Sequence, residues 1–351
     1  MSIESEGKTL REKISKDDQV GVSVALFGQP GAGKSSLINS LLGRKVAEVG
    51  IGTDVTTEAG EYEHGGLKFI DLPGYGTKGF PADDKYFERF DITGKDLFLC
   101  AIAGKLTDGD VNFFKKLDEL GKTCIFVVTK SDQIWEDGVA VEKLKEYKIE
   151  DICKHVGKRV EIKFVSTRTK EGLGELQDAI SMKLSDAKRE RWERKAAAYS
   201  LDFLDKKHEA CKKRVYMAAG TSALNGLNPI PGANVAVDVG VLLTLFKQIK
   251  DDYGLDDDYL TSLNTTSAGV GAIAPIANQV MSWATKEGLL LLLKRFATQE
   301  AVKTAASAIP FVGSAIAASV GFGITLKAGN SYLDDCHKLA EVRLRAVLKQ
   351  E

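Results

Sequence analysis

The chain has 351 residues, of which 44% are hydrophobic and 28% are charged, so it has the length of about two globular domains and is not a disordered polypeptide. Its 48 basic and 49 acidic side chains leave a formal net charge of −1, which excludes the strong nonspecific attraction of a basic protein to nucleic acid or acidic lipid. The 5 cysteines form no CxxC pair, so we expect a reducing compartment and neither a disulfide framework nor a zinc site.

The first segment, residues 1–19, is polar and charged. It lacks the apolar run of a secretory signal, and residue 2 is Ser rather than the Gly that myristoylation needs. We therefore expect a cytoplasmic protein, and any contact with a membrane is expected to be peripheral.

Short β-rich apolar runs alternate with helical patterns over residues 20–184. Five runs are flanked by Gly, Asp or Thr, which favours parallel strands with crossover helices: 22–27, 67–70, 97–103, 124–128 and 160–165. Residues 58–64 precede a Gly-Gly pair and are typical of one arm of a hairpin, which would add an antiparallel edge strand. Residues 20–184 are therefore predicted to form an α/β domain with a six-stranded, mostly parallel sheet and flanking helices.

A glycine-rich loop follows the first predicted strand. The sequence from Gly28 to Ser35, GQPGAGKS, fits the pattern GxxxxGK[ST] and opens a predicted helix, as a phosphate-binding loop requires. In such a loop backbone N–H groups surround phosphate oxygens, Lys34 reaches the β- and γ-phosphates, and the Ser35 hydroxyl binds Mg²⁺. The predicted phosphate-binding residues are Gly28, Gly31, Ala32, Gly33, Lys34, Ser35 and Ser36.

A DxxG pattern follows the second parallel run. Asp71 comes directly after residues 67–70, at the carboxyl end of a strand beside the phosphate site. We expect Asp71 to hold Mg²⁺ through a water molecule and the Gly74 N–H to contact the γ-phosphate.

A TKxD pattern, which indicates the base, follows the run at 124–128. The Asp132 carboxylate can accept hydrogen bonds from both N1–H and the 2-amino group of guanine, donors that adenine lacks. The Lys130 stem would cover the face of the base, and the backbone N–H groups of Ser166 and Thr167 would bind the guanine oxygen. The predicted base-binding residues are Thr129, Lys130, Asp132, Ser166 and Thr167.

Helical periodicity replaces the β pattern after about residue 172. A long amphipathic helix is expected over residues 185–214, with basic side chains that would help at an anionic surface and an apolar face of Trp192, Ala196, Tyr199 and Phe203. Charge-free stretches follow at 215–237, 259–285 and 304–326, and two of them contain Ile-Pro segments typical of helical hairpins. A buried helical core is favoured for these hairpins over reversible membrane insertion, and constitutive spanning is the least favoured.

These motifs, in this order, resemble the Ras-like GTPase fold over residues 22–183. More narrowly, the loop GxxGxGKSS, Gly52-Thr53, DLPG followed by Phe80-Pro81, and TKxD before a wholly helical second half resemble the immunity-related GTPases (IRG family). The resemblance implies that residues 1–19 form an N-terminal helical segment packed with an all-α domain of residues 185–351. It also implies that two G domains pair across their nucleotides.

The resemblance further implies a Mg²⁺-binding threonine between the phosphate loop and DxxG. Thr53, Thr56 and Thr57 all lie there, and Thr56 is favoured, with Lys34 as the other catalytic residue. Ras-type enzymes orient the attacking water with a Gln directly after DxxG, where this chain has Tyr75. We therefore expect slow intrinsic hydrolysis, with the missing group supplied by Glu58, Lys78 or an Arg of the partner.

The sequence therefore predicts a Mg²⁺-dependent GTPase that binds GTP and GDP and whose nucleotide state drives self-assembly into a dimer or oligomer, with membrane lipid as a second partner. No basic, aromatic-interleaved pattern indicates nucleic acid. The alternative is a nucleotide-dependent structural or membrane-associated module with negligible hydrolysis. An Era-type GTPase acting in RNA handling is disfavoured, because no KH-like GxxG follows the G domain.

Overall fold

The computed structural model divides the chain into two compact units, residues 20–203 and residues 1–19 with 204–351. The structure describes residues 12, 16–17, 19–47, 59–76, 79–81, 83–225, 239–263, 273–305 and 313–348, without the side chains of 223–225, 297–305 and 313–320.

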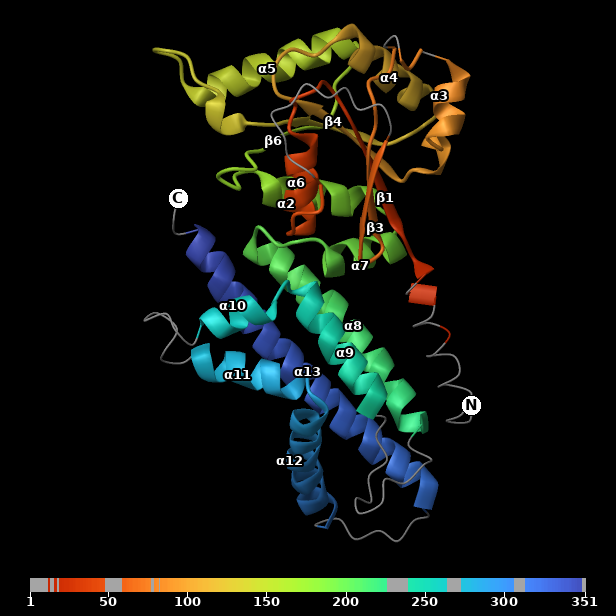
Figure 1. Ribbon diagram of the computed structural model, residues 1–351, viewed down its shortest axis with the longest axis vertical. Coiled ribbons are helices and arrows are strands. Elements are labelled where there is room, and N and C mark those ends of the chain that lie inside the picture. Colours follow the sequence, from red (N-terminus) through yellow and green to blue (C-terminus); the bar gives the residue numbers. More distant parts are fainter. Residues whose placement is uncertain are drawn as a thin grey trace. The chain divides into compact units, whose positions relative to one another are not determined.

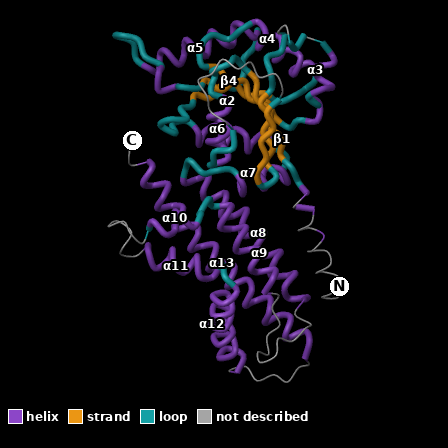
Figure 2. Tube along the Cα trace, viewed as in Figure 1, coloured by secondary structure: helices purple, strands orange, loops and turns teal. Residues whose placement is uncertain are grey.

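The first unit is built on one six-stranded sheet, which confirms the predicted α/β class (Figure 2). The strands are β1 (Val22–Phe27), β2 (Gly60–His64), β3 (Leu67–Asp71), β4 (Leu97–Ile102), β5 (Cys124–Val128) and β6 (Ile162–Phe164). Their order is β2-β3-β1-β4-β5-β6, and β2 alone among them pairs antiparallel, with β3. The Gly65-Gly66 turn joins β2 to β3 with positive φ at both glycines, which produces the predicted hairpin.

Helices cover both faces of this sheet (Figure 1). They are α2 (Lys34–Leu42), α3 (Asp84–Arg89), α4 (Asp108–Glu119), α5 (Val141–Val156), α6 (Leu173–Lys183) and α7 (Asp186–Lys195), with short 3-10 helices η1 (Ile92–Gly94) and η2 (Ser131–Gln133). Side chains alternate along β1, so Val24 and Leu26 join the core formed with α2, α6 and α7. Ala25 and Phe27 join the core formed with α3, α4 and α5.

The parallel strands end side by side at one edge of the sheet. Leu26 of β1 pairs with Asp71 of β3, and Phe27 pairs with Cys100 of β4. The next pair in the sheet is Ile102 of β4 with Val128 of β5. Loops that leave these strands therefore meet at the same edge, where open α/β sheets bind ligands.

The long helix expected over residues 185–214 is wrong, because the chain leaves the helical conformation between α7 and α8 (Leu201–Asn225). At Ala196 the backbone is extended, and the Ala197 N–H donates to Leu41 O at 3.0 Å. The Gln177 side chain donates to Ala197 O and accepts from Tyr199 N at 3.2 Å. Contacts with α2 and α6 thus satisfy the backbone groups that a continuous helix would have paired internally.

The basic side chains of α7 bind the α/β unit rather than forming a free basic face. Arg191 and Arg194 are buried, and Arg191 Nε donates to Val20 O at 2.9 Å. Lys188 pairs with Asp96, and Arg189 Nε donates to Ser181 O at 2.9 Å. These four side chains of α7 are therefore engaged by the α/β unit.

The second unit is helical. Its elements after α8 are α9 (Val239–Asp252), α10 (Asp257–Ser262), α11 (Ile273–Trp283), α12 (Lys286–Ala305) and α13 (Gly313–Leu348). Helix α13 packs against α9, α11 and α12, and Phe246 of α9 stacks on Tyr332 of α13 with ring centroids 4.0 Å apart. Asp17 of the N-terminal segment lies 2.7 Å from Arg214 Nη1 of α8, within the same unit.

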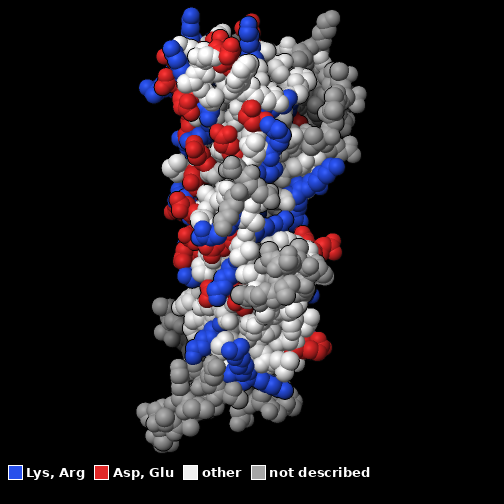
Figure 3. Space-filling model, turned by 90° about the vertical axis from the view of Figure 1, so that its left-hand side faces the viewer, with Lys and Arg blue, Asp and Glu red and all other residues white. Residues whose placement is uncertain are grey.

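Both Ile-Pro segments lie outside the described residues, as do parts of all three charge-free stretches. Among the described helices, none has the length and apolar character needed to cross a bilayer. Figure 3 shows acidic and basic side chains intermingled over much of one face, in keeping with the near-zero net charge.

Candidate functional site

The glycine-rich loop connects β1 to α2 in a conformation that depends on its glycines. Gly28, Gly31 and Gly33 have φ of +130°, +76° and +79°. A Cβ atom at Gly28 would lie 2.1 Å from Ala101 O, so no other residue fits there without movement of the backbone. Helix α2 begins directly after Gly33, and the unpaired N–H groups of its first turn lie at the end of the loop. A glycine-rich loop before a helix N-terminus is suited to binding phosphate.

The Lys34 side chain folds back over this loop. Its Nζ donates to Gly28 O at 2.9 Å and lies 3.6 Å from Asp71 Oδ1. The ammonium group is therefore held between the loop and the end of β3, in a position to meet an anion on the loop.

Asp71 ends β3 and is buried. Its Oδ1 makes no hydrogen bond to any part of the chain that the structure describes. Burial raises the pKa of Asp71 above its usual value, and the charge of Lys34 opposes that rise. A buried carboxylate oxygen without a hydrogen bond is suited to a hard cation or to one of its bound waters, so the residue fits the predicted Mg²⁺ site.

Within the described ranges, no group of three or more His, Cys, Asp or Glu side chains is arranged to hold a metal ion. The expected magnesium site differs in kind, because Mg²⁺ takes few protein carboxylates and is completed by water and substrate phosphates. Ser35, beside Lys34 in α2, is the second predicted ligand. Thr56 and the rest of the Gly52–Glu58 segment lie outside the described residues, as does Lys78.

Thr129 ties the end of β5 to the phosphate loop. Its buried hydroxyl lies 2.7 Å from Ala32 O and 3.3 Å from Ile102 O. The first residue of the TKxD motif therefore holds the loop in place through its side chain. Lys130 follows with φ of +54°, and this left-handed turn leads into η2, which carries Asp132.

Asp132 is contacted by residues that follow β6. A hydrogen bond from the Ser166 hydroxyl, together with Arg168, holds the pKa of Asp132 below its usual value against the effect of burial. Arg168 Nη2 lies 2.7 Å and Arg168 Nε 3.0 Å from Asp132 Oδ2. The structure thus brings together Asp132 and Ser166, two of the predicted base-binding residues, and adds Arg168, which the sequence analysis missed.

The predicted backbone contact from Ser166 to a base is not available in this structure, because the Ser166 N–H donates to Glu171 O at 3.0 Å. Thr167 contributes its carbonyl oxygen, which accepts from Lys170 Nζ at 2.6 Å. Gly74 is exposed after β3.

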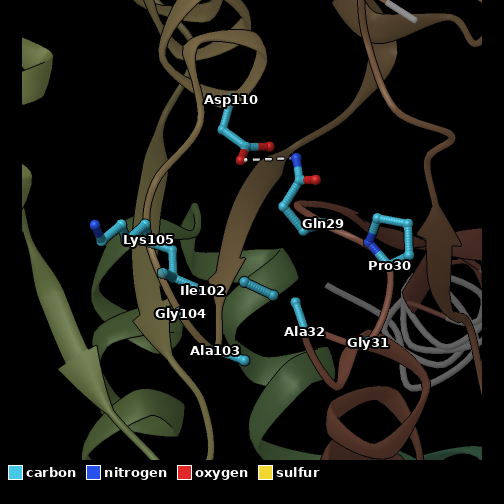
Figure 4. A pocket seen from close by; sticks show the side chains of 10 residues that line it. Gln29, Pro30, Gly31, Ala32, Ile102, Ala103, Gly104, Lys105 and Asp110 are labelled. Atoms are coloured by element: carbon cyan, nitrogen blue, oxygen red, sulfur yellow. Dashed lines mark hydrogen bonds between the residues drawn. The ribbon is translucent and has the colours of Figure 1, made fainter.

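A pocket of about 230 Å³ adjoins the phosphate loop, between the loop and the segment that follows β4 (Figure 4). Gln29 and Asp110 both line this pocket. Gln29 Nε2 donates to Thr107 Oγ1 at 2.9 Å and to Asp110 Oδ2 at 3.3 Å. Thr107 and Asp110 also form the capping box of α4. The spacing T-x-x-D in the sequence indicates the start of α4. The contact with Gln29 joins residues far apart in the sequence and arises only in the folded chain.

Tyr75, directly after DxxG, packs into an aromatic cluster. Its ring centroid lies 5.1 Å from that of Tyr86, 5.7 Å from that of Phe87 and 5.0 Å from that of Phe113. Partial burial raises the pKa of Tyr75, so its phenol stays neutral. The side chain is engaged by α3 and α4.

A family model described as Interferon-inducible GTPase (IIGP) matches residues 3–270. Interferon-inducible GTPase 5 of Bos taurus is 25% identical over 389 aligned positions, which cover 97% of this chain and 79% of the relative. Interferon-inducible GTPase 1 of Mus musculus is 30% identical over 139 positions, 37% of this chain and 33% of the relative. Among solved structures, the G domain of the T. maritima FeoB iron transporter is 28% identical and covers 46% of this chain and 98% of its own, with a TM-score of 0.31.

Proposed function

This chain belongs to the interferon-inducible GTPase (IIGP) family and is a GTPase, and from this premise we propose that its hydrolysis depends on Mg²⁺ and is coupled to self-assembly. The observation that carries the Mg²⁺ dependence is the pairing of Lys34 with the buried Asp71 beside the glycine-rich loop, where Asp71 Oδ1 makes no hydrogen bond within the described residues.

In the proposed complex, backbone N–H groups of the loop and of the first turn of α2 bind the phosphates. The residues are Gly28, Gly31, Ala32, Gly33, Lys34, Ser35 and Ser36. Lys34 exchanges its contact with Gly28 O for the β- and γ-phosphates, and the Gly74 N–H contacts the γ-phosphate. Release of the ammonium group from a carbonyl to a phosphate is favourable, because a charge-assisted pair replaces a bond to a neutral acceptor.

Ser35, Asp71 and Thr56 are the proposed ligands of Mg²⁺, with Asp71 acting through a water molecule. When bound, Mg²⁺ neutralises charge that develops on the phosphate oxygens. Asp71 must be ionised for this role, and the Lys34 ammonium 3.6 Å away favours the ionised form.

Guanine is recognised through Asp132, with Lys130 against the base. Thr129 supports the site through its contact with the loop, and Ser166 orients the carboxylate. Thr167 is the remaining candidate for a backbone contact with the base.

Slow intrinsic hydrolysis follows from Tyr75. Its ring packs among Tyr86, Phe87 and Phe113, so it does not replace an amide that would orient water. We propose that a second copy of the chain supplies the missing charge stabilisation, with an Arg of the partner, Glu58 or Lys78 as the contributing group.

Phosphate release measured against protein concentration tests this coupling. Turnover per molecule is expected to rise with concentration in the presence of GTP and Mg²⁺, with the Lys34→Ala variant as the inactive control. Constant turnover across the range would contradict self-assembly. Constant turnover close to zero, with GTP still bound, would instead favour a nucleotide-dependent structural module.

We also propose a cytoplasmic protein that associates peripherally with membranes. A buried helical core remains the favoured role of the charge-free stretches, because Val215, Leu260 and Ile324 within them are buried. Liposome flotation with GTP and with GDP tests this proposal. The protein is expected to float with vesicles in at least one nucleotide state, and its absence from the vesicle fraction in both states would rule out the association.

A further inference from the structure

Arg168 binds the Asp132 carboxylate, which is the group expected to bind the guanine base. Two of its nitrogens, Nη2 at 2.7 Å and Nε at 3.0 Å, contact the same oxygen, Oδ2 of Asp132. The Asp132 side chain is 9% exposed, whereas that of Arg168 is 76% exposed. The acceptor is therefore enclosed by the protein, and the donor reaches it from solvent.

The chemistry of this contact matches that of the nucleotide. A guanidinium group presents adjacent N–H donors from one rigid plane, and the N1–H and 2-amino edge of guanine has the same N–C–N arrangement. Each forms its best pair with a carboxylate through two N–H donors. Both Arg168 donors lie on Oδ2 and use its acceptor sites, whereas the guanine pair needs Oδ1 and Oδ2 together. Arg168 in this position and guanine are therefore alternatives.

We propose that Arg168 is an internal competitor for guanine: the side chain and the base need the same carboxylate, so Arg168 must leave Asp132 before the base is recognised. This inference rests on the proposed role of Asp132 in base binding. It assigns to Arg168 control over how fast guanine nucleotides enter.

The loop that carries Arg168 is held independently of this side chain. Thr169 N donates to Ser166 Oγ at 3.1 Å, and Lys170 N donates to Ser166 O at 2.9 Å. The same Ser166 hydroxyl also contacts Asp132. None of these contacts involves the guanidinium group, so the Arg168 side chain can leave while the loop keeps its conformation.

Competition of this kind lowers the apparent affinity by the fraction of molecules in which Asp132 is available. The effect falls on association, because the arginine has already left the carboxylate once guanine is bound. It also falls on guanine nucleotides alone, since adenine has no donor pair for Asp132. An ion pair with one exposed partner supports a change of about two- to fivefold.

The test is stopped-flow binding of fluorescent GDP and ADP to the full chain. Arg168→Ala is expected to raise the GDP association rate about two- to fivefold, with an unchanged GDP dissociation rate and an unchanged ADP affinity. Arg159→Ala, at an exposed arginine before β6, makes the same change of charge and should bind GDP as the parent does. Arg168→Lys, which keeps the charge but loses the paired donors, should lie between the parent and Arg168→Ala.

Slower GDP association, or faster GDP dissociation, in Arg168→Ala would overturn the inference, because Arg168 would then support the bound base. An equal gain for ADP would also overturn it, because the effect would then be general electrostatics. Asp132→Asn, measured in parallel, separates this failure from that of the premise. If Asp132→Asn keeps guanine preference, the base assignment itself fails; if it loses that preference while Arg168→Ala has no effect, only the competition fails.

Discussion

The Lys34 ammonium group lies 3.6 Å from Asp71 Oδ1, where the neighbouring strands β1 and β3 end. The backbone supports this approach, because Leu72 N donates to Leu26 O at 2.8 Å immediately beside it. The opposite charges of Lys34 and Asp71 compensate each other's burial. At 3.6 Å, however, Lys34 Nζ is too far from Asp71 Oδ1 for a hydrogen bond. This arrangement supports the proposal that Lys34 binds an anion and that Asp71 helps to hold a cation.

Replacement of Lys34 by Ala should abolish tight GTP binding. The variant loses a charge-assisted contact with phosphate and leaves Asp71 buried without its counter-charge, so affinity should fall about 10- to 100-fold. Titration calorimetry with GTP and Mg²⁺ measures the change. Lys115→Ala, at an exposed lysine of α4, is the matched control and should bind normally. An unaltered dissociation constant for Lys34→Ala would contradict the phosphate assignment.

The Asp132→Asn variant should shift base preference from guanine towards xanthine. The amide NH₂ of Asn donates where the carboxylate accepted, and xanthine carries a carbonyl oxygen where guanine carries its 2-amino group. The change is measured by the competition of GTP and of XTP with fluorescent GDP for the binding site, and ATP is the reference nucleotide. Guanine selectivity equal to that of the parent would refute recognition through Asp132.

Gly28→Ala should destabilise the α/β unit by about 3 kcal/mol or more, since φ of +130° is strained for Ala and the new Cβ would lie 2.1 Å from Ala101 O. Gly31→Ala is the matched control in the same loop. No atom lies within 4 Å of its added Cβ, so only the left-handed φ opposes it, at about 1 kcal/mol. Urea unfolding followed by circular dichroism should rank the parent above Gly31→Ala and Gly31→Ala above Gly28→Ala; equal midpoints for the two variants would contradict the steric argument.

The histidine pair of the helical unit predicts a pH dependence of stability. His208 of α8 and His337 of α13 have ring centroids 4.6 Å apart, and their Nε2 atoms lie 2.9 Å from Asp334 Oδ1 and 3.5 Å from Asp205 Oδ1, respectively. Burial, followed by the charge of His208, lowers the pKa of His337 below 6.5. The unfolded chain therefore binds the proton first as pH falls, so His337 favours the folded state above about pH 6.5, and this contribution is lost as pH falls through its lower folded-state pKa.

The measurement is the urea midpoint from about pH 8 to about pH 5. The midpoint should fall on acidification, and His337→Gln should show a smaller fall. The slope with pH is the readout rather than the midpoint itself, because the substitution also changes packing. A slope equal to that of the parent would show that His337 does not set the dependence.

Local patterns predicted much of the fold and the centre of the site. The strands were readable because each is a short apolar run bounded by turn residues. The phosphate loop was readable because its glycines are required by backbone geometry at Gly28 and Gly33. The break between α7 and α8 was not readable, because Trp192, Ala196 and Phe203 keep helical spacing across it. The groups that end the helix, Gln177 and Leu41, are distant in sequence.

The amino-acid sequence by itself determined the class of the protein and predicted a phosphate loop and the acid that would bind the base, because these depend on residue types at short, fixed spacing. Only the tertiary structure decided which side chains surround them. Arg168 reaches Asp132 across 36 positions, Lys34 meets Asp71 across two strands, and Tyr75 enters an aromatic cluster of two helices. Such contacts arise when a twisted sheet brings loop ends to one edge, and that convergence leaves no periodic trace in the chain.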